Sequence, residues 1–344
     1  MTFRRALGYA LTTLLVGCSM GQGAVPNATL NATASLPQAV GVAVQPNVNI
    51  KGQIYVANES NNTVTVYSSN GGNERPTITK HVDEPRALAF DKEGNLYVAD
   101  YGDSTVSVYP AGSTKPKRVI TAGVYYPQAV AVNSEGRLYV GNSNNTVTVY
   151  APNRSSLLQT ISQSVNDPVA LMFDSKDRLY VADYGGASVT IYGKNQSSVM
   201  LTISQDMNGP WAMALDHENY LYVANRGNST ITVYSPKNAE NPKIISGTTV
   251  SDPIAVLLGK GEQVYALNQG NNTLSVYAHG SLKAVRTVSS GISGPTAMYI
   301  NKLGYIFVLN SGTDNITEYR ASSNSVIRTI TGGMSGAQSL AVAP

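Results

Sequence analysis

Apolar and polar residues alternate with a period of two in short segments along most of the chain. In residues 63–67, for example, Val64 and Val66 share one face, and Thr63, Thr65 and Tyr67 share the other. β-branched and aromatic residues dominate these segments, as is usual on a pleated surface. The alternation predicts β-strands and argues against helical repeats, whose apolar residues would recur with a period of 3.6.

A strand–turn–strand unit, such as residues 96–109, occurs seven times. The aromatic residue in the second position of its first strand marks the copies at intervals of 42, 42, 41, 42, 43 and 42 residues: Tyr55, Tyr97, Tyr139, Tyr180, Tyr222, Tyr265 and Phe307. A period of about 40–45 residues is typical of four-stranded propeller blades. The expected fold is therefore all-β, a seven-bladed β-propeller with four-stranded blades.

One blade can be written as four strands, A to D, predicted at residues 85–90, 96–99, 105–109 and 117–121. A small residue recurs in strand A: Ala87, Ala129, Ala170, Ala212, Ala255, Ala297 and Ser339. Blades converge near the axis, so the innermost strand has room only for small side chains. The seventh strand A, at residues 337–342, comes at the end of the chain. It is expected to join the first blade beside residues 54–57, because closing the ring removes the exposed edges of an open array.

Residue types present in every blade are expected to serve the blade itself. An Asn or Asp follows each strand B, at Asn58, Asp100, Asn142, Asp183, Asn225, Asn268 and Asn310. We interpret this set as turn-forming side chains that bond the backbone two residues on, rather than as a ring of metal ligands. The Gly two residues later, as in Gly102 and Gly185, is expected to supply a positive φ.

The first 17 residues have the features of a signal peptide. Arg4 and Arg5 precede an eleven-residue, largely apolar run, which is too short to span a bilayer comfortably. The run ends in Leu15-Val16-Gly17-Cys18, which resembles the lipobox of bacterial lipoproteins. That resemblance implies cleavage before Cys18 and its lipidation, and Ser19 implies sorting to the outer membrane. The alternative is an ordinary secretory signal. Residues 18–45 then read as a flexible tether, and residues 46–344 as the propeller.

Composition adds two expectations. The chain has 344 residues, of which 13% are charged, and a formal net charge of +3. Without Arg4 and Arg5 the balance is 22 basic against 21 acidic residues, so nonspecific binding to nucleic acid or to anionic membrane is not expected. Twenty-one Tyr against four Phe predict rings whose hydroxyls reach water or a partner.

The pattern Tyr-Val-Ala-Asn/Asp followed by Thr-Val-x-Val-Tyr is similar to the YVTN-type and NHL-type propeller repeats of bacterial extracytoplasmic proteins. The resemblance covers roughly residues 46–344. It is specific for the fold and weak for activity, because these families include binding proteins, lactonases and lyases.

Function is expected where the blades differ. Alternating strand direction places the B–C turns and the connections between blades on one face, here called the mouth face. The variable residues on it predicted to bind a ligand are Tyr101, Tyr184, Trp211, Arg226, Arg86 and Gln269. Trp211, the single Trp, either lines a pocket or packs between blades. Aromatic, Arg and amide side chains suit a protein, glycan or small-molecule ligand.

Catalysis has less support in the sequence. His81 belongs to the mouth face, whereas His217 and His279 belong to the opposite face, and no triad or zinc motif is present. No cofactor is expected. Glu84, Asp167 and Asp252 each precede a strand-A Pro, and the resemblance to propeller lactonases implies a possible site for Ca²⁺ or another divalent cation there. The alternatives to a binding module are thus a lactonase- or lyase-like enzyme and a purely structural envelope protein.

Overall fold

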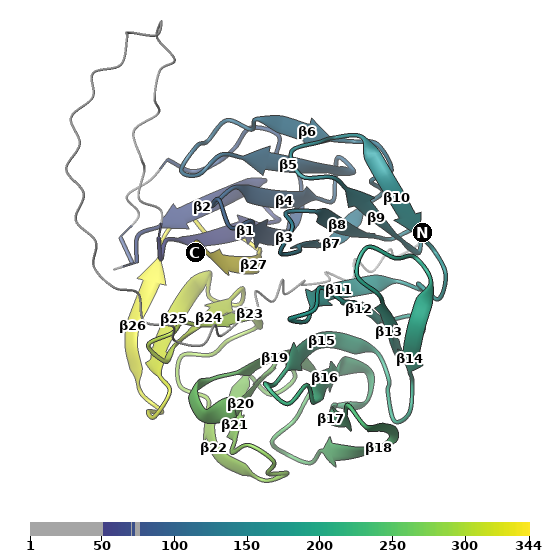
Figure 1. Ribbon diagram of the computed structural model, residues 1–344. Coiled ribbons are helices and arrows are strands. Elements are labelled where there is room, and N and C mark those ends of the chain that lie inside the picture. The colour runs from purple at the N-terminus through teal and green to yellow at the C-terminus, as the bar shows by residue number, and fades with distance from the viewer. Residues whose placement is uncertain (1–50, 70, 73–75) are drawn as a thin grey trace, which may run out of the picture.

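The computed structural model describes residues 51–69, 71–72 and 76–344, and these form seven antiparallel sheets around a central axis (Figure 1). Each sheet is one blade, and the blades follow one another around the ring in chain order. The expected fold, an all-β seven-bladed propeller, is confirmed.

The strand bounds follow the repeat closely. Blade 2 consists of β3 (Pro85–Phe90), β4 (Leu96–Asp100), β5 (Thr105–Tyr109) and β6 (Arg118–Ile120). Blade 3 consists of β7 (Pro127–Val132), β8 (Leu138–Asn142), β9 (Thr146–Tyr150) and β10 (Leu157–Ile161). Blade 4 consists of β11 (Pro168–Phe173), β12 (Leu179–Asp183), β13 (Ser188–Tyr192) and β14 (Val199–Ile203). Blade 5 consists of β15 (Pro210–Leu215), β16 (Leu221–Asn225), β17 (Thr230–Ser235) and β18 (Asn238–Ile245). Blade 6 consists of β19 (Pro253–Leu258), β20 (Val264–Asn268), β21 (Thr273–Tyr277) and β22 (Ala284–Val288). Blade 7 consists of β23 (Pro295–Ile300), β24 (Tyr305–Asn310), β25 (Asn315–Arg320) and β26 (Val326–Thr331).

Blade 1 is assembled from both ends of the described chain. β1 (Ile54–Asn58) lies between β2 (Thr63–Tyr67) and the C-terminal β27 (Ala337–Val342), as Figure 1 shows. Its fourth position is taken by Ile78, which exchanges two backbone hydrogen bonds of 2.9 Å with Val64. The predicted closure of the ring by the C-terminal strand is therefore confirmed.

The innermost strands form the core of the ring. β27, β3, β7, β11, β15, β19 and β23 contact one another in that order, and β23 returns to β27. The small residue predicted in each of them is buried in every blade. These positions can take only small side chains because neighbouring blades approach one another most closely there.

The recurring Asn and Asp after each second strand are fully buried and have a structural role wider than expected. Asn142 donates to the Val140 carbonyl, two residues earlier, at 3.2 Å, and to the Thr148 hydroxyl at 3.1 Å. Its side-chain oxygen accepts the Tyr125 N–H at 2.9 Å. One amide thus ties the second strand to the third and to the connection that enters the blade.

The expectation for the following Gly was wrong. Gly102 and Gly185 are not among the residues with positive φ; that conformation falls two residues later, at Ser104 (φ 52°) and Ala187 (φ 46°). A Cβ on Gly102 would lie 2.3 Å from an Asp83 carboxylate oxygen. At the equivalent Gly312, which also lacks a positive φ, a Cβ would lie 2.8 Å from the Ser293 carbonyl oxygen, so the close approach of the interblade connection favours Gly at this position.

The last tyrosine of each third strand is buried, and its hydroxyl reaches a backbone carbonyl. Tyr150 donates to the Ala122 carbonyl at 2.6 Å, in the connection that enters its blade. Tyr67 makes the equivalent bond to Gly332 at 2.5 Å, across the point where the ring closes. Burial raises the pKa of Tyr67 to about 12, so this donor stays protonated at neutral pH.

Several sequence-based predictions lie outside the described residues. They are the signal peptide at 1–17, lipidation of Cys18, the tether at 18–45 and the first residues of the propeller segment. In the part of the chain that the structure describes, no helix has the length and hydropathy needed to cross a membrane.

Candidate functional site

The mouth face is built as the strand directions predicted. The Tyr101 N–H donates to the Glu84 carbonyl at 3.2 Å, which joins a turn between second and third strands to an interblade connection. The Arg226 N–H makes the same bond to Gly209 at 2.9 Å. The six residues predicted to bind a ligand fall on this face in two separate contact groups.

The first group joins blades 1, 2 and 3. Arg86 donates to the Glu59 carboxylate at 3.2 Å, and its guanidinium carbon lies 3.3 Å from the centre of the Tyr101 ring. The Tyr101 ring contacts Tyr126 with centroids 5.1 Å apart, and Tyr126 contacts Tyr125 at 4.9 Å. Arg86 is buried, whereas Tyr125 and Tyr126 are 49% and 39% exposed. The group thus runs from a partly buried ion pair to an open aromatic surface, here called the tyrosine surface (Tyr101, Tyr125 and Tyr126).

Tyr126 occupies a backbone position that suits other residues better. Its φ is 41°, in the left-handed region, where a bulky side chain is rare and costs about 1 kcal/mol or more. The same position in every other blade also has positive φ and holds a Gly or an acidic residue: Glu84, Asp167, Gly209, Asp252, Gly294 and Gly336. The blade fold does not require an aromatic ring at this position, because the other six blades have none there.

The second group joins blades 4 to 7 and is largely enclosed. Trp211 is only 1% exposed, and it lies between Tyr184, with ring centroids 5.6 Å apart, and the Arg226 guanidinium, 4.6 Å away. Arg226 donates to Asp252 at 2.8 Å and to Gln269 at 2.9 Å. Gln269 in turn donates to the Pro295 carbonyl at 3.0 Å. Of the two interpretations of Trp211, the structure supports packing between blades.

The three mouth carboxylates considered for a cation do not gather into one site. Among the described residues, one group of three Asp, Glu, His or Cys side chains has its ligand atoms close together. Glu84, Asp167 and Asp252 do not belong to that group. Asp167 accepts a hydrogen bond from Gln128 at 2.6 Å, and Asp252 pairs with Arg226. Left-handed φ explains the choice of Asp at 167 and 252, because Asp tolerates that conformation better than most residues do.

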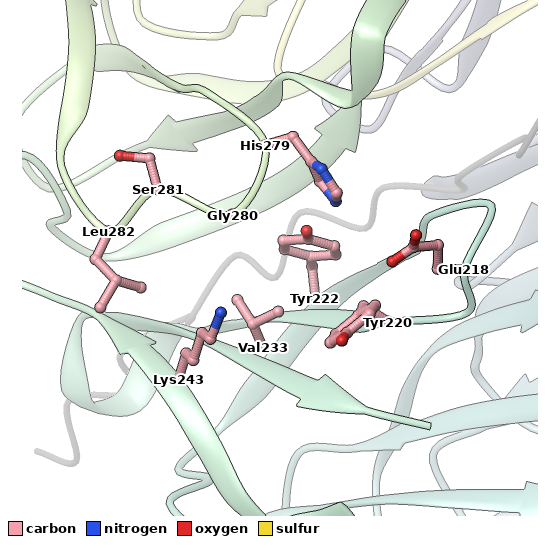
Figure 2. A pocket seen from close by; sticks show the side chains of 9 residues that line it. All are labelled: Glu218, Tyr220, Tyr222, Val233, Lys243, His279, Gly280, Ser281 and Leu282. Atoms are coloured by element: carbon pink, nitrogen blue, oxygen red, sulfur yellow. The ribbon is translucent and has the colours of Figure 1, made fainter. Parts of the chain in front are cut away.

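The opposite face carries a pocket between blades 5 and 6. It has a volume of about 110 Å³, and Figure 2 shows Tyr220, Tyr222 and Lys243 on one side with His279 facing them; the full lining is Glu218, Tyr220, Tyr222, Val233, Lys243, His279, Gly280, Ser281 and Leu282. Desolvation, followed by the charge of Asp216, raises the pKa of Tyr222 well above its usual range. The pocket therefore combines a neutral tyrosine with a lysine and a histidine.

A group of acidic and histidine side chains borders this pocket. His279 Nε2 lies 3.4 Å from Asp216 Oδ2 and 3.6 Å from Glu262 Oε2. His217 Nδ1 forms a close contact with Glu262 Oε1, and this hydrogen bond is the main cause that raises the pKa of His217. The sequence correctly placed His217 and His279 on the face opposite His81, but it did not show that a common acidic partner connects them.

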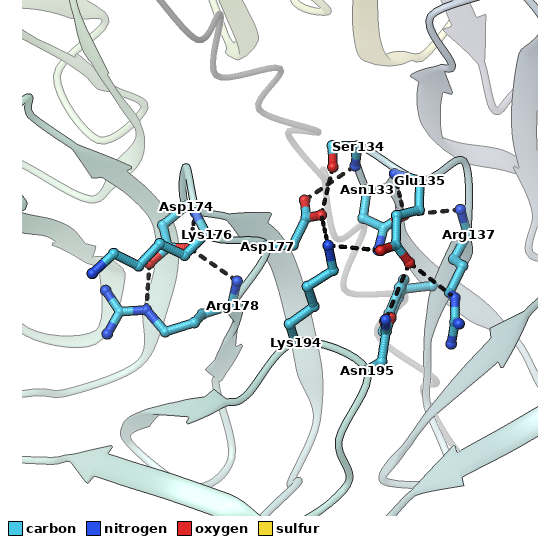
Figure 3. Close-up of polar contacts among 11 residues, drawn as sticks. Asn133, Ser134, Glu135, Arg137, Asp174, Lys176, Asp177, Arg178, Lys194 and Asn195 are labelled. Carbon is cyan, nitrogen blue, oxygen red and sulfur yellow. Dashed lines mark hydrogen bonds and ion pairs between the residues drawn. The ribbon is translucent and has the colours of Figure 1, made fainter.

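A different polar cluster spans the same face between blades 3 and 4. Figure 3 shows Lys194 between two carboxylates, with Nζ 2.6 Å from Glu135 and 3.3 Å from Asp177. Asp177 also accepts the Ser134 backbone N–H at 3.1 Å. Cation and anions are paired here, so this cluster fastens two blades together.

One signal in the sequence could have located the His279 group. The residue two places after the last tyrosine of the third strand is His279 in blade 6, but Ser69, Ala111, Pro152, Lys194, Pro236 or Ala321 elsewhere. Comparing blades on the opposite face, as on the mouth face, would have singled it out.

Solved structures share this fold. A Lactobacillus plantarum protein is 17% identical, with a TM-score of 0.69 over 84% of this chain and 98% of its own. A functionally unknown protein from Desulfotomaculum acetoxidans is 14% identical, with a TM-score of 0.70 over 85% and 99%. Virginiamycin B lyase from Staphylococcus aureus is 11% identical, with a TM-score of 0.60 over 73% and 85%. At these identities the likeness defines the class of protein, a β-propeller, and nothing finer.

Sequence comparison does not assign the chain to a family. No protein-family model matches the chain, and no curated protein matches it.

Proposed function

We propose that the protein is an extracytoplasmic β-propeller, anchored by a lipid at Cys18, that binds a protein, glycan or small-molecule ligand through the tyrosine surface of its mouth face. The anchor rests on the Leu15–Cys18 motif, and outer-membrane sorting rests on Ser19. A lipid-anchored module with a rigid, outward-facing binding surface suits recognition at the cell envelope.

The observation that carries this proposal is Tyr126. A bulky residue held at positive φ costs stability, and such costs cluster at functional positions. Tyr125 and Tyr126 are exposed aromatic side chains, a type that can stack on a sugar or pack on an apolar side chain while the hydroxyl offers a hydrogen bond. Arg86, held by its ion pair with Glu59, packs on the Tyr101 ring, so the surface is organised before any ligand arrives.

The alternatives receive less support. A lactonase- or lyase-like activity at the mouth, with its cation, would need Glu84, Asp167 and Asp252 to converge, and in the described residues they form no such group. The likeness to a lyase at 11% identity supports only the fold. A purely structural role leaves the strained aromatic at position 126 unexplained.

Replacing Tyr126 with Gly, the residue of blades 5, 7 and 1 at this position, should preserve the fold and weaken binding. Wild type and variants are tested on immobilised panels of oligosaccharides and of synthetic peptides. For a probe that binds wild type, we expect Tyr126→Gly and Tyr125→Ala to weaken affinity ten-fold or more, about 1.4 kcal/mol.

Tyr220→Ala, which removes an aromatic ring from the opposite face, is the matched control and should bind as wild type does. Thermal unfolding of Tyr126→Gly should match or exceed that of wild type, because Gly relieves the positive φ. Equal binding by the Tyr126→Gly variant would contradict the proposed surface.

A further inference from the structure

We infer that Asp216, Glu262 and His279 form a binding site for a divalent transition-metal ion, on the face opposite the tyrosine surface. This site is independent of the proposed binding function. One ligand atom from each of these three residues lies within 4.8 Å of the other two, and His279 Nε2 is close to Asp216 Oδ2 and to Glu262 Oε2.

The distances favour a metal over an ion pair. A charge-assisted N–H···O bond to a carboxylate is about 2.7–2.9 Å long, whereas His279 Nε2 is 3.4 and 3.6 Å from the two carboxylate oxygens. A tetrahedral zinc ion with bonds of about 2.0–2.2 Å separates its ligand atoms by about 3.3–3.6 Å. Both distances from His279 Nε2 therefore match the edges of a tetrahedral site.

The surrounding backbone holds both carboxylates in place. Asp216 accepts the Tyr220 N–H on Oδ1 at 2.7 Å, and Glu262 accepts the His217 N–H on Oε1 at 2.8 Å. Each carboxylate thus has one oxygen fixed by a turn and directs the other toward His279. His217, bonded to Glu262 through Nδ1, is a positioning residue of the kind that orients metal ligands from behind.

The chemistry of the donors selects the ion. One imidazole nitrogen and two carboxylate oxygens suit Zn²⁺ or Co²⁺ better than Ca²⁺, which takes six to eight oxygen ligands. The Asp216 side chain is fully buried, while His279 is 39% exposed. His279 also lines the 110 Å³ pocket, so a bound ion would sit at the edge of that pocket and be reached from it.

The test is zinc titration of the full chain by calorimetry after chelator treatment, in a Cys18→Ser background so that the thiol cannot bind metal. We expect one zinc per chain, and at least thirty-fold weaker binding in His279→Gln and in Glu262→Gln. His81→Gln, which changes a histidine on the mouth face, is the matched control and should bind as the Cys18→Ser parent does. Co²⁺ should give the strong visible absorption of a tetrahedral site in the parent and in His81→Gln, and not in His279→Gln.

Both variants change partly exposed side chains, so folding is not expected to fail, and far-ultraviolet circular dichroism checks this directly. Absence of saturable binding at millimolar zinc would overturn the inference. Equal affinity of His279→Gln and the Cys18→Ser parent would overturn it as well, because the metal would then be held elsewhere.

Discussion

Deleting residues 337–344 is expected to abolish the cooperative thermal unfolding of the protein. β27 supplies the innermost strand of blade 1, pairs with β1 and contacts β3 and β23. It buries Leu340 to 3% exposure, and removal of a buried Leu side chain alone costs about 2–5 kcal/mol. Adding the lost strand pairing brings the total to the order of the whole stability of a domain, about 5–15 kcal/mol.

Circular dichroism during heating measures this effect, and two point variants calibrate it. Leu340→Ala should lower the free energy of unfolding by about 2–5 kcal/mol, whereas Leu303→Ala, at a residue 83% exposed, should change it by less than about 0.5 kcal/mol. A truncated chain that keeps the wild-type cooperative transition would show that the ring is held closed by other contacts.

The fold was predictable from the sequence because a propeller repeats its own constraints. A 42-residue period, strands with alternating apolar residues and a small residue in each inner strand follow from the geometry of one blade, and each appears seven times. Ring closure was predictable for a related reason, since the order of strands left one innermost strand for the C-terminal end. The structure confirms these features almost residue by residue.

Contacts between blades were not predictable in the same way. A Gly can be required by its φ angle or by lack of space, and the sequence does not distinguish the two. A Cβ on Gly102 would meet the Asp83 side chain, which comes from the connection between blades. The positive φ falls instead at Ser104, which carries no such signal in its residue type.

The candidate sites, too, were predictable only in part from the sequence. Variation between blades marked Tyr101, Trp211 and Arg226 as candidates, but it did not separate an exposed ring from a buried one. Trp211 is enclosed by Tyr184 and Arg226, whereas Tyr126, in a connection between blades, is 39% exposed. Burial depends on how adjacent blades meet, and no single repeat contains that information.

Asp183→Asn is expected to remove a substantial part of a pH-dependent loss of stability near neutral pH. Asp183 is fully buried in blade 4, and desolvation by burial raises its pKa from 3.8 to about 7. The Asn166 N–H at 3.1 Å and the Thr190 hydroxyl at 3.0 Å donate to the carboxylate and only partly offset that cost. Five blades have an amide at this position: Asn58, Asn142, Asn225, Asn268 and Asn310.

The direction in which the free energy of unfolding changes with pH follows from proton binding. Between pH 3.8 and 7 the folded state keeps a proton on Asp183 that the unfolded state has lost, so the free energy of unfolding falls as pH rises through this range. From pH 5 to pH 8 this contribution amounts to about 2–3 kcal/mol. An amide does not titrate, so the Asp183→Asn variant should lack this contribution and gain most, relative to wild type, at pH 8.

Urea unfolding at pH 5, 6, 7 and 8 measures the effect. Asp206→Asn, the same change at an exposed residue, is the control and should keep the wild-type slope. Asp100 stands at the same position in blade 2 and burial raises its pKa as well, so Asp100→Asn should flatten the profile further in the double variant. If Asp183→Asn and wild type lost stability in parallel between pH 5 and pH 8, Asp183 would be charged in the folded protein throughout that range.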